Sequence, residues 1–240
     1  MFPSDAKLAA AVASPPDSIP EVLSAMRAID AACVDGDGLK WFNWLYLQVT
    51  SAVEARVNAG GFADPAWLAA LDVQFARLYF GALAGFLSGG ACPACWRALF
   101  EARNNTRIAR VQFAMAGINA HINRDLPLAI VATCHAPGTV PQHGSTQYND
   151  FTALNSTLDA LIDTARKTLH VRLAGDALPE VSHLEDLIAA WGTAEARERA
   201  WTNSEVLWHL EASPALTAGF LDSLDAMTTF AAEALLVPVP

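Results

Sequence analysis

The sequence predicts an all-α protein, a single bundle of about eight or nine helices whose central helices are buried. Apolar residues recur at helical spacing along most of the 240 residues, of which 53% are hydrophobic and only 17% charged. No run alternates apolar and polar residues with an excess of β-branched side chains, as a half-buried strand would. No linker or internal repeat divides the chain. We therefore expect one helical domain over residues 1–240, with residues 1–19 as a loosely ordered N-terminal arm.

The first half of the chain contains three predicted helices that end at glycine-containing turns. Pro20–Cys33 places apolar side chains at helical spacing and leads into the turn Asp35–Gly38. Leu39–Ala59 is apolar nearly all round, which is typical of a central buried helix. Ala66–Leu87 follows an aspartate–proline pair, an N-cap residue with proline at the first helical position.

Helical spacing continues through the second half of the chain. We expect a short helix, then a long helix interrupted by Pro127, then a loop rich in proline, glycine and histidine over His135–Ser145. Further helices follow, one of them marked by a Ser-x-x-Glu capping box. The expected helical ranges are Pro93–Arg103, Thr106 to about Cys134, Gln147–Val171, Ser182–Trp191, Thr193–Leu210 and Pro214–Leu236.

The charge balance and the apolar runs limit the partners that we expect. The formal net charge is −10, which disfavours general binding to nucleic acid or anionic lipid, because phosphate binding needs a basic surface. The N-terminus lacks the basic start and apolar run of a secretory signal, and no stretch has the apolar length of a membrane span. We expect a soluble cytoplasmic protein. Cys92 and Cys95 form a lone Cys-x-x-Cys pair, which we interpret as reduced thiols at a helix start.

The segment from Asn119 to Pro127 is the strongest candidate for chemistry. It places polar side chains inside an otherwise apolar helix, where unpaired polar groups are costly. His121 and Asp125 are four residues apart, so they share one helix face. An imidazole nitrogen and a carboxylate oxygen form half of a site for zinc, iron or manganese. Pro127 clashes with the carbonyl of Asn123, so we expect a kink beside this pair.

The same pair has a structural interpretation. Aspartate often fixes the tautomer of a histidine four residues away, with no ligand and no catalysis. Both interpretations stay open at the level of sequence.

Four motifs resemble those of a bacterial helical family of unknown function. The resemblance covers about two thirds of the chain, and it implies a cluster of polar positions at Asp72, His121, Asp125, Asp150 and Asn155. The motifs are Asp72-Val-Gln-Phe75-Ala76, Asn119-Ala-His121-Ile-Asn123-Arg-Asp125-Leu126, Asp150-Phe151-Thr-Ala-Leu-Asn155 and Ala200-Trp201…Leu207-Trp208.

The central motif also resembles, more locally, the metal-binding helix of zinc-dependent phospholipases C and related nucleases. That resemblance implies zinc ions and phosphoester hydrolysis. This chain departs from the pattern, because proline follows Asp125 by only two residues and Ala129 stands where a histidine is expected. A trinuclear zinc site is therefore not carried over.

Further ligands can be suggested for a site around His121 and Asp125. Asp72 lies in an apolar helix and completes a set of three ligands with an open position. Asp150 is a fourth candidate, although it also suits the N-cap of its own helix, and His143 could contribute. A network of carboxylates and arginines without metal is the alternative, in which Asp72 pairs with Arg77 or Arg124. The candidate substrate-binding residues are Asn119, Asn123, Tyr79, Trp44 and Asn155.

These residues favour an enzyme that acts on a small, largely apolar molecule in a pocket at the centre of the bundle. His121, Asp125 and Asp72 are the candidate catalytic residues, with metal-dependent hydrolysis as the first hypothesis. A lyase or cyclase that uses the same pair as acid and base is the nearest alternative. A non-catalytic helical protein that binds a ligand or a partner is another. The substrate and the oligomeric state are open.

Overall fold

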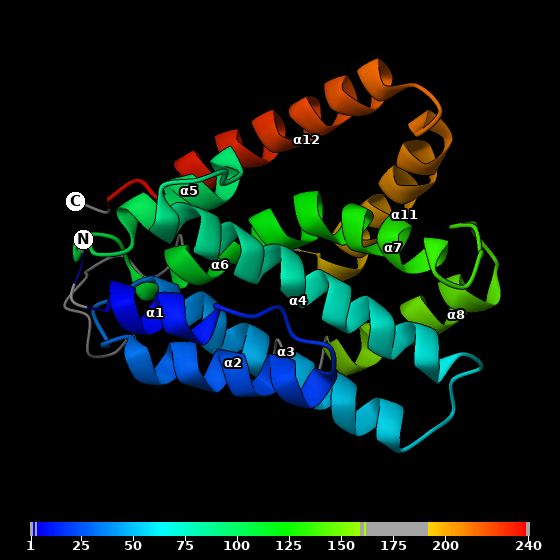
Figure 1. Cartoon of the computed structure of the whole chain (residues 1–240), viewed down its shortest axis with the longest axis horizontal. Helices are drawn as coiled ribbons and strands as arrows, with labels where there is room; N and C mark the ends of the chain where they lie inside the picture. Colours follow the sequence, from blue (N-terminus) through cyan, green and yellow to red (C-terminus); the bar gives the residue numbers. More distant parts are fainter. Residues whose placement is uncertain (1, 3, 159–160, 162–191, 239–240) are drawn as a thin grey trace.

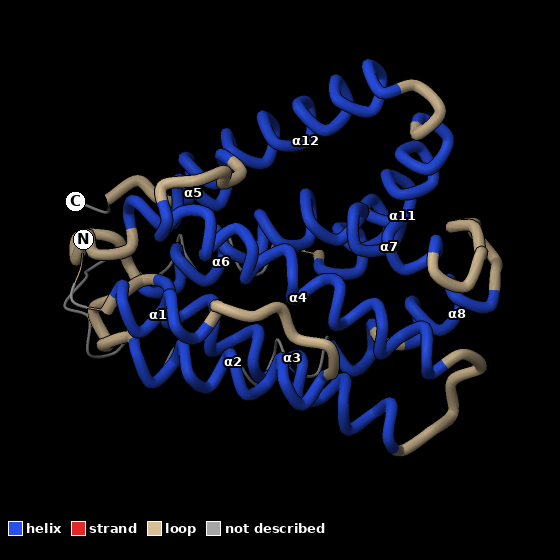
Figure 2. The backbone as a smooth tube through the Cα atoms, in the orientation of Figure 1, coloured by secondary structure: helices blue, strands red, loops and turns tan. Residues whose placement is uncertain are grey.

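The computed structural model describes residues 2, 4–158, 161 and 192–238, and every regular element within these ranges is a helix (Figure 2). The prediction of an all-α fold is therefore confirmed for this part of the chain. No helix in these ranges is both long and apolar enough to cross a membrane.

The helices follow the predicted order, with boundaries that shift by a few residues (Figure 1). The predicted helix Ser182–Trp191 and the second part of Gln147–Val171 lie outside the described residues. The observed bounds are α1 Asp5–Ala11, α2 Ile19–Ala32, α3 Leu39–Asn58, α4 Pro65–Ser88, α5 Ala94–Ala102, α6 Arg110–Ala120, η1 His121–Asp125, α7 Leu126–His135, α8 Thr146–Ala153, α11 Thr193–Leu210 and α12 Pro214–Leu235.

The central helices are enclosed by helices from both ends of the chain. Figure 1 shows α1 and α2 side by side along one edge and α12 along the opposite edge, with α4 running between them. Helix α3 packs on α2 and α6, while α7 packs on both α4 and α11. Helix α12 packs on α5 and α6. This arrangement surrounds the segment that links α6 to α7, which carries His121 and Asp125.

The N-terminal segment differs from the expected loose arm. Residues Asp5–Ala11 form helix α1, and Leu8 is fully buried in the main apolar core. The Arg103 side chain, also fully buried, forms an ion pair with Asp5. A buried guanidinium needs a carboxylate partner, so the start of the chain is fixed by this pair and by burial of Leu8.

The predicted start of α4 is confirmed in detail. The Asp64 side chain accepts a hydrogen bond from the Trp67 amide at 3.0 Å, and proline occupies the first helical turn. The helix ends at Gly89, whose φ of 71° lies in the left-handed region that glycine adopts without strain.

Candidate active site

The link between α6 and α7 is a single π-helical turn, η1, over His121–Asp125. Pro127 has no N–H group, and its ring would clash with the carbonyl of Asn123 in a regular α-helix. The sequence predicts a kink at this point, and the structure has a π turn here, which interrupts the regular hydrogen-bond ladder. Such turns inside α-helices occur often at functional sites.

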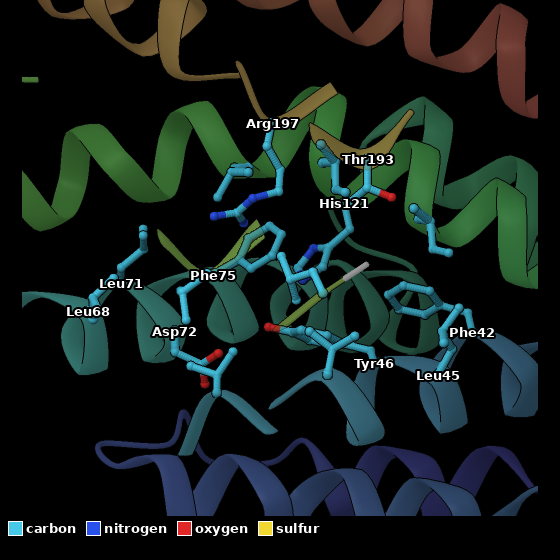
Figure 3. Close-up of a pocket in the computed structure, with 17 residues that line it drawn as sticks. Phe42, Leu45, Tyr46, Leu68, Leu71, Asp72, Phe75, His121, Thr193 and Arg197 are labelled. Atoms are coloured by element: carbon cyan, nitrogen blue, oxygen red, sulfur yellow. The ribbon is translucent and has the colours of Figure 1, made fainter. Parts of the chain in front are cut away.

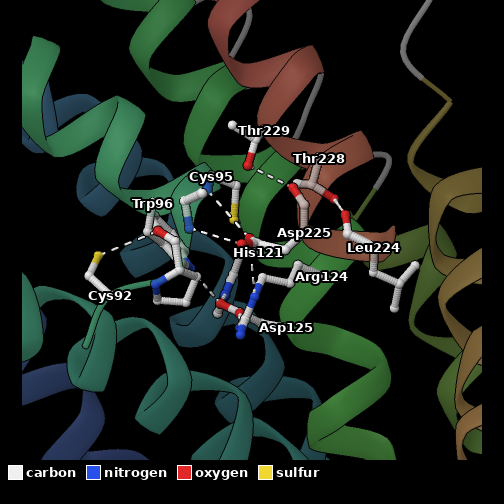
Figure 4. Close-up of polar contacts among 12 residues, drawn as sticks. Cys92, Cys95, Trp96, His121, Arg124, Asp125, Leu224, Asp225, Thr228 and Thr229 are labelled. Carbon is white, nitrogen blue, oxygen red and sulfur yellow. Dashed lines mark hydrogen bonds and ion pairs between the residues drawn. The ribbon is translucent and has the colours of Figure 1, made fainter. Parts of the chain in front are cut away.

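His121 and Asp125 form a buried hydrogen-bonded pair. The distance from His121 Nδ1 to Asp125 Oδ2 is 3.1 Å, and the two residues are 2% and 0% exposed. The Trp96 indole N–H donates to the same oxygen at 2.8 Å, and Arg124 donates to the other oxygen at 2.7 Å (Figure 4). Because a carboxylate paired with Arg124 can only accept hydrogen bonds, His121 donates its Nδ1 proton to Asp125. The predicted common face of the pair is confirmed.

The other ring nitrogen of His121 is free. Nε2 is buried and has no hydrogen-bond partner among the described residues. The ring lies parallel to Phe75, with centroids 3.4 Å apart, and meets the edge of Tyr46 at 4.5 Å. Burial lowers the pKa of His121 below its ordinary value, although the Asp125 carboxylate opposes this shift. The imidazole is therefore neutral near pH 7, with a lone pair on Nε2.

Nε2 belongs to a residue that lines an apolar cavity of about 100 Å³ (Figure 3). The cavity lies where the two largest clusters of the apolar core meet, since it takes residues from both. The polar residues on its wall are few. The lining residues are Phe42, Leu45, Tyr46, Val49, Val53, Leu68, Leu71, Asp72, Phe75, Ile118, His121, Ile122, Leu126, Leu154, Leu158, Thr193 and Arg197.

A close contact between α3 and α6 sets one wall of this cavity. Gly117 lies one turn before His121, and a Cβ atom at this position would overlap the Phe42 ring. The absence of a side chain lets Phe42 pack against α6, where its ring centroid is 5.7 Å from that of His121. The glycine therefore helps to bring the aromatic face of α3 against the imidazole.

Asp72 lines the cavity and has no basic partner among the residues that the structure describes. Its Oδ2 atom is buried and has no hydrogen-bond partner among the described residues. Burial, with a smaller contribution from Glu54, raises the pKa of Asp72 to about 7. Arg77 pairs with Asp17, and Arg124 with Asp125 and Asp225. The carboxylate–arginine pairing considered for Asp72 thus occurs at Asp125 instead.

Tyr46 completes the polar end of the cavity. Its hydroxyl is buried beside that of Thr50, and neither hydroxyl has a partner of ordinary hydrogen-bond geometry in the described part of the chain. Burial and the nearby Asp72 carboxyl raise the pKa of Tyr46 well above its ordinary value, and the Thr50 hydroxyl opposes this rise only in part. In Figure 3 the Tyr46 hydroxyl points toward the region between Asp72 and His121.

The four predicted metal ligands are not gathered at one point. Asp150 accepts hydrogen bonds from the amides of Ala63 and Asp64 at 3.0 and 2.6 Å, at the start of α4. It is not the N-cap of its own helix, because Ser145 has that role. Asp125 faces Nδ1 of His121, whereas Nε2 is the free nitrogen. Within the described residues, no group of three or more His, Cys, Asp or Glu side chains could hold a metal ion.

Comparison with known proteins places the chain in a family but assigns no activity. The model of a family of unknown function, DUF5995, matches residues 19–238. The chain belongs to this family. No curated protein and no solved structure matches it. The resemblance to a helical family of unknown function is thereby confirmed, and every residue of the cavity of this DUF5995 protein lies inside the matched range.

The predicted substrate-binding residues of this DUF5995 chain lie around the cavity rather than on its wall. Asn119 donates to the Thr228 carbonyl of α12 at 2.8 Å and accepts from Asn123 at 2.9 Å. Asn155 accepts a hydrogen bond from Arg197 at 2.8 Å. These contacts connect the helices that surround the site.

Two aromatic candidates also lie off the cavity wall. The Tyr79 hydroxyl is buried and lies 3.5 Å from Asn43 Oδ1. Trp44 lines a separate depression on the other side of α3, together with Asp30, Asp35, Lys40, Trp41 and Arg110.

A polar network connects the His121–Asp125 pair of this DUF5995 member to α5 and α12. Arg124, which holds Asp125, also lies 3.5 Å from the Asp225 carboxylate (Figure 4). Asp225 in turn accepts hydrogen bonds from the first amides of α5, those of Ala94 and Cys95. Because α5 carries Trp96, the network fixes both donors to Asp125. Cys95 is a free thiol, as is Cys92, whose pKa burial raises to about 11.

Sequence reasoning missed several residues of the site. Trp96 and Tyr46 reach His121 and Asp125 from other helices, and no spacing rule connects positions so far apart. Arg197 lines the cavity and donates to the Phe151 carbonyl at 2.8 Å. Of these residues, Phe75 alone could be predicted to lie at the site, because it comes three residues after Asp72 and so shares its helix face.

Proposed function

We propose that this protein is an enzyme that performs acid–base chemistry on a small, largely apolar molecule bound beside His121. The observation that carries the proposal is the Nε2 atom, which belongs to a wall residue of an apolar cavity and has no described partner, while Asp125 fixes Nδ1. An unpaired buried polar group costs about 1–3 kcal/mol. A purely structural histidine would be expected to use both nitrogens, so the free one supports a role toward a ligand.

The surrounding residues suit general base catalysis. Asp125 orients the imidazole and stabilises the positive charge that forms when His121 accepts a proton. Trp96 and Arg124 hold Asp125 in place and act as positioning residues. Asp72, whose pKa is about 7, is available both as an acid and as a base near neutral pH.

Metal-dependent hydrolysis, the first hypothesis from the sequence, remains a prediction. His121 Nε2 and Asp72 are the donors that could face an ion in the cavity, and a catalytic metal site ordinarily has three protein ligands. Proton transfer by His121 needs no further ligand. The acid–base form of the proposal therefore requires fewer protein groups in the cavity than the metal-dependent form.

The experiment uses the wild-type protein, His121→Gln and the control His143→Gln, whose histidine lies outside the cavity. Each is incubated with small apolar compounds of several classes, including a short-chain ester, an allylic alcohol and a ketone, and conversion is followed by ¹H NMR. We expect the wild type and His143→Gln to convert at least one compound. In His121→Gln the rate of this conversion should fall by at least about 100-fold.

Two results would contradict the proposal. Equal conversion by His121→Gln and the wild type would show that His121 is not the base. Binding without conversion of any compound would favour the non-catalytic alternative. Metal analysis and treatment with a chelator belong to the same experiment. Activity lost with the chelator and restored by zinc or manganese would support the metal-dependent form.

A further inference from the structure

The cavity has one polar end, and three helices build it. His121 comes from η1, Tyr46 from α3 and Asp72 from α4. Each has a buried polar atom without a hydrogen-bond partner among the described residues: Nε2, the hydroxyl and Oδ2. Buried polar groups are nearly always paired, so these three atoms on one cavity call for a partner. They define the polar groups that a ligand must satisfy.

These three groups differ in what they offer. A neutral imidazole with its proton on Nδ1 offers only a lone pair at Nε2. The Tyr46 phenol stays protonated, because its pKa lies well above the ordinary value, so it can donate. With a pKa of about 7, Asp72 is substantially protonated near neutral pH and can also donate. The polar end therefore pairs one base with two hydrogen-bond donors.

The remaining wall limits the ligand. Almost all of it is aliphatic or aromatic. An apolar cavity of about 150 Å³ can hold benzene, so the volume of about 100 Å³ suits a molecule of roughly four to six non-hydrogen atoms.

We propose that the substrate is a small enolisable carbonyl compound, whose oxygen accepts hydrogen bonds from Tyr46 and Asp72 and whose α-carbon faces His121. This inference rests on the proposed function and gives it a substrate class. One oxygen satisfies both donors, and an adjacent C–H bond meets the base. Tyrosine beside a neutral carboxylic acid is an effective arrangement for an enolate oxygen, because both donors strengthen as negative charge develops there.

The step balances without a co-reactant. His121 Nε2 takes the α-proton, and the electron pair of the C–H bond becomes the new C=C bond. The carbonyl π electrons move to the oxygen, which takes a proton from the Asp72 carboxyl group. The reverse steps return a proton to the same carbon, or to a conjugated carbon, which would isomerise the substrate. Asp125 stabilises the imidazolium that forms in between.

The experiment measures exchange of α-hydrogen for deuterium in D₂O at neutral pH, with cyclopentanone and 2-butanone as probes, by ¹H NMR. The wild type is expected to exchange both faster than buffer. Tyr46→Phe and Asp72→Leu each remove one donor and should lower the rate by about 100-fold. His121→Gln should reduce it to the buffer rate. His143→Gln and Tyr148→Phe are matched controls outside the cavity and should exchange like the wild type.

The outcomes separate this inference from the proposed function. Binding of either ketone to the wild type is measured in parallel by ligand-observed NMR. If the ketones fail to bind, or bind without exchange, the carbonyl assignment is overturned. The proposed function would then still stand if His121→Gln abolished conversion of an ester or an alcohol. Exchange that survives in Tyr46→Phe and Asp72→Leu would overturn the assigned roles of these two donors.

Discussion

His121 and His143 use their ring nitrogens in opposite ways. His121 is buried, gives one nitrogen to Asp125 and leaves the other without a described partner. His143 lies on the surface between α7 and α8 and uses both, with Nδ1 2.7 Å from Glu205 and Nε2 2.7 Å from Glu198. A histidine with both nitrogens paired holds two elements together, whereas a half-paired one beside a cavity has a nitrogen available for a ligand.

The pKa of each histidine shifts in the direction that its surroundings dictate. Burial is the main influence on His121 and lowers its pKa, since a charged imidazole is poorly solvated there. Burial also opposes the charge on His143, but hydrogen bonds to Glu198 and Glu205 outweigh it and raise the pKa. The surroundings of His121 therefore favour the neutral imidazole, whereas those of His143 favour the charged one.

The largest expected difference between the two regions is in stability. Asp125→Ala removes the acceptor for His121, Trp96 and Arg124 in a fully buried place, so we expect a loss of about 3–5 kcal/mol in the free energy of unfolding. Glu198→Ala removes contacts with His143 and Tyr148 at a side chain that is 44% exposed, where water screens the charges, and should cost about 1 kcal/mol or less. Urea denaturation of the two variants checks this ratio. Similar losses would show that the buried network is no more constrained than the surface one.

The sequence could predict the Asp125 contact with His121 but not its other contacts. A spacing of four residues on a helix is local information, and so are the cap at Asp64 and the break at Pro127. The Trp96 indole meets Asp125 from 29 residues earlier, which depends on how α5 packs. Asp150 likewise binds the start of α4 across 86 residues, so its role as a cap for another helix could not be predicted from its own surroundings.

Two of the predicted substrate-binding residues make hydrogen bonds between helices. Asn119 pairs with a group on α12, and Asn155 with a group on α11. A helix interface and a ligand site make the same demand on a buried amide, which is to be hydrogen-bonded. Sequence alone does not distinguish these two partners. The cavity does, because Asp72, Tyr46 and His121 on its wall each keep one polar atom that no described residue pairs.

Asp72 offers a second test of the contrast between the buried site and the surface, with a smaller expected change in stability. Its pKa in the folded protein, about 7, lies above the ordinary value of 3.8, so the folded state holds its proton more tightly than the unfolded state. Stability is therefore lost as pH rises between these values. One pKa unit corresponds to about 1.4 kcal/mol. Asp72→Asn should relieve this loss and stabilise the protein at pH 8 by a few kcal/mol relative to its effect at pH 4.

The measurement is urea denaturation of the wild type and Asp72→Asn at pH 4, 6 and 8. Asp222→Asn, on the exposed side of α12, is the matched control and should show no such trend. A gain from Asp72→Asn that is equal at all three pH values would mean that the Asp72 carboxyl is not destabilised by burial. The gain at high pH would instead identify a residue kept in the cavity at the expense of stability.

The smallest expected effect tests the signs of the two histidine shifts directly. The raised pKa of His143 means that its stabilising contribution is fully present below the ordinary histidine pKa of 6.5 and is lost as pH rises through the folded value. The lowered pKa of His121 has the opposite consequence. As pH falls below 6.5, the unfolded state binds a proton at this imidazole more readily than the folded state does.

The measurement is the difference in the free energy of unfolding between the wild type and each histidine variant. For His143→Gln, the difference should increase in favour of the wild type toward pH 5, by a few tenths of a kcal/mol because the side chain is 41% exposed. For His121→Gln, the difference in the free energy of unfolding should change against the wild type over the same pH range. Slopes of the same sign would mean that both imidazoles titrate in similar surroundings, and the contrast between a paired surface histidine and a half-paired cavity histidine would fail.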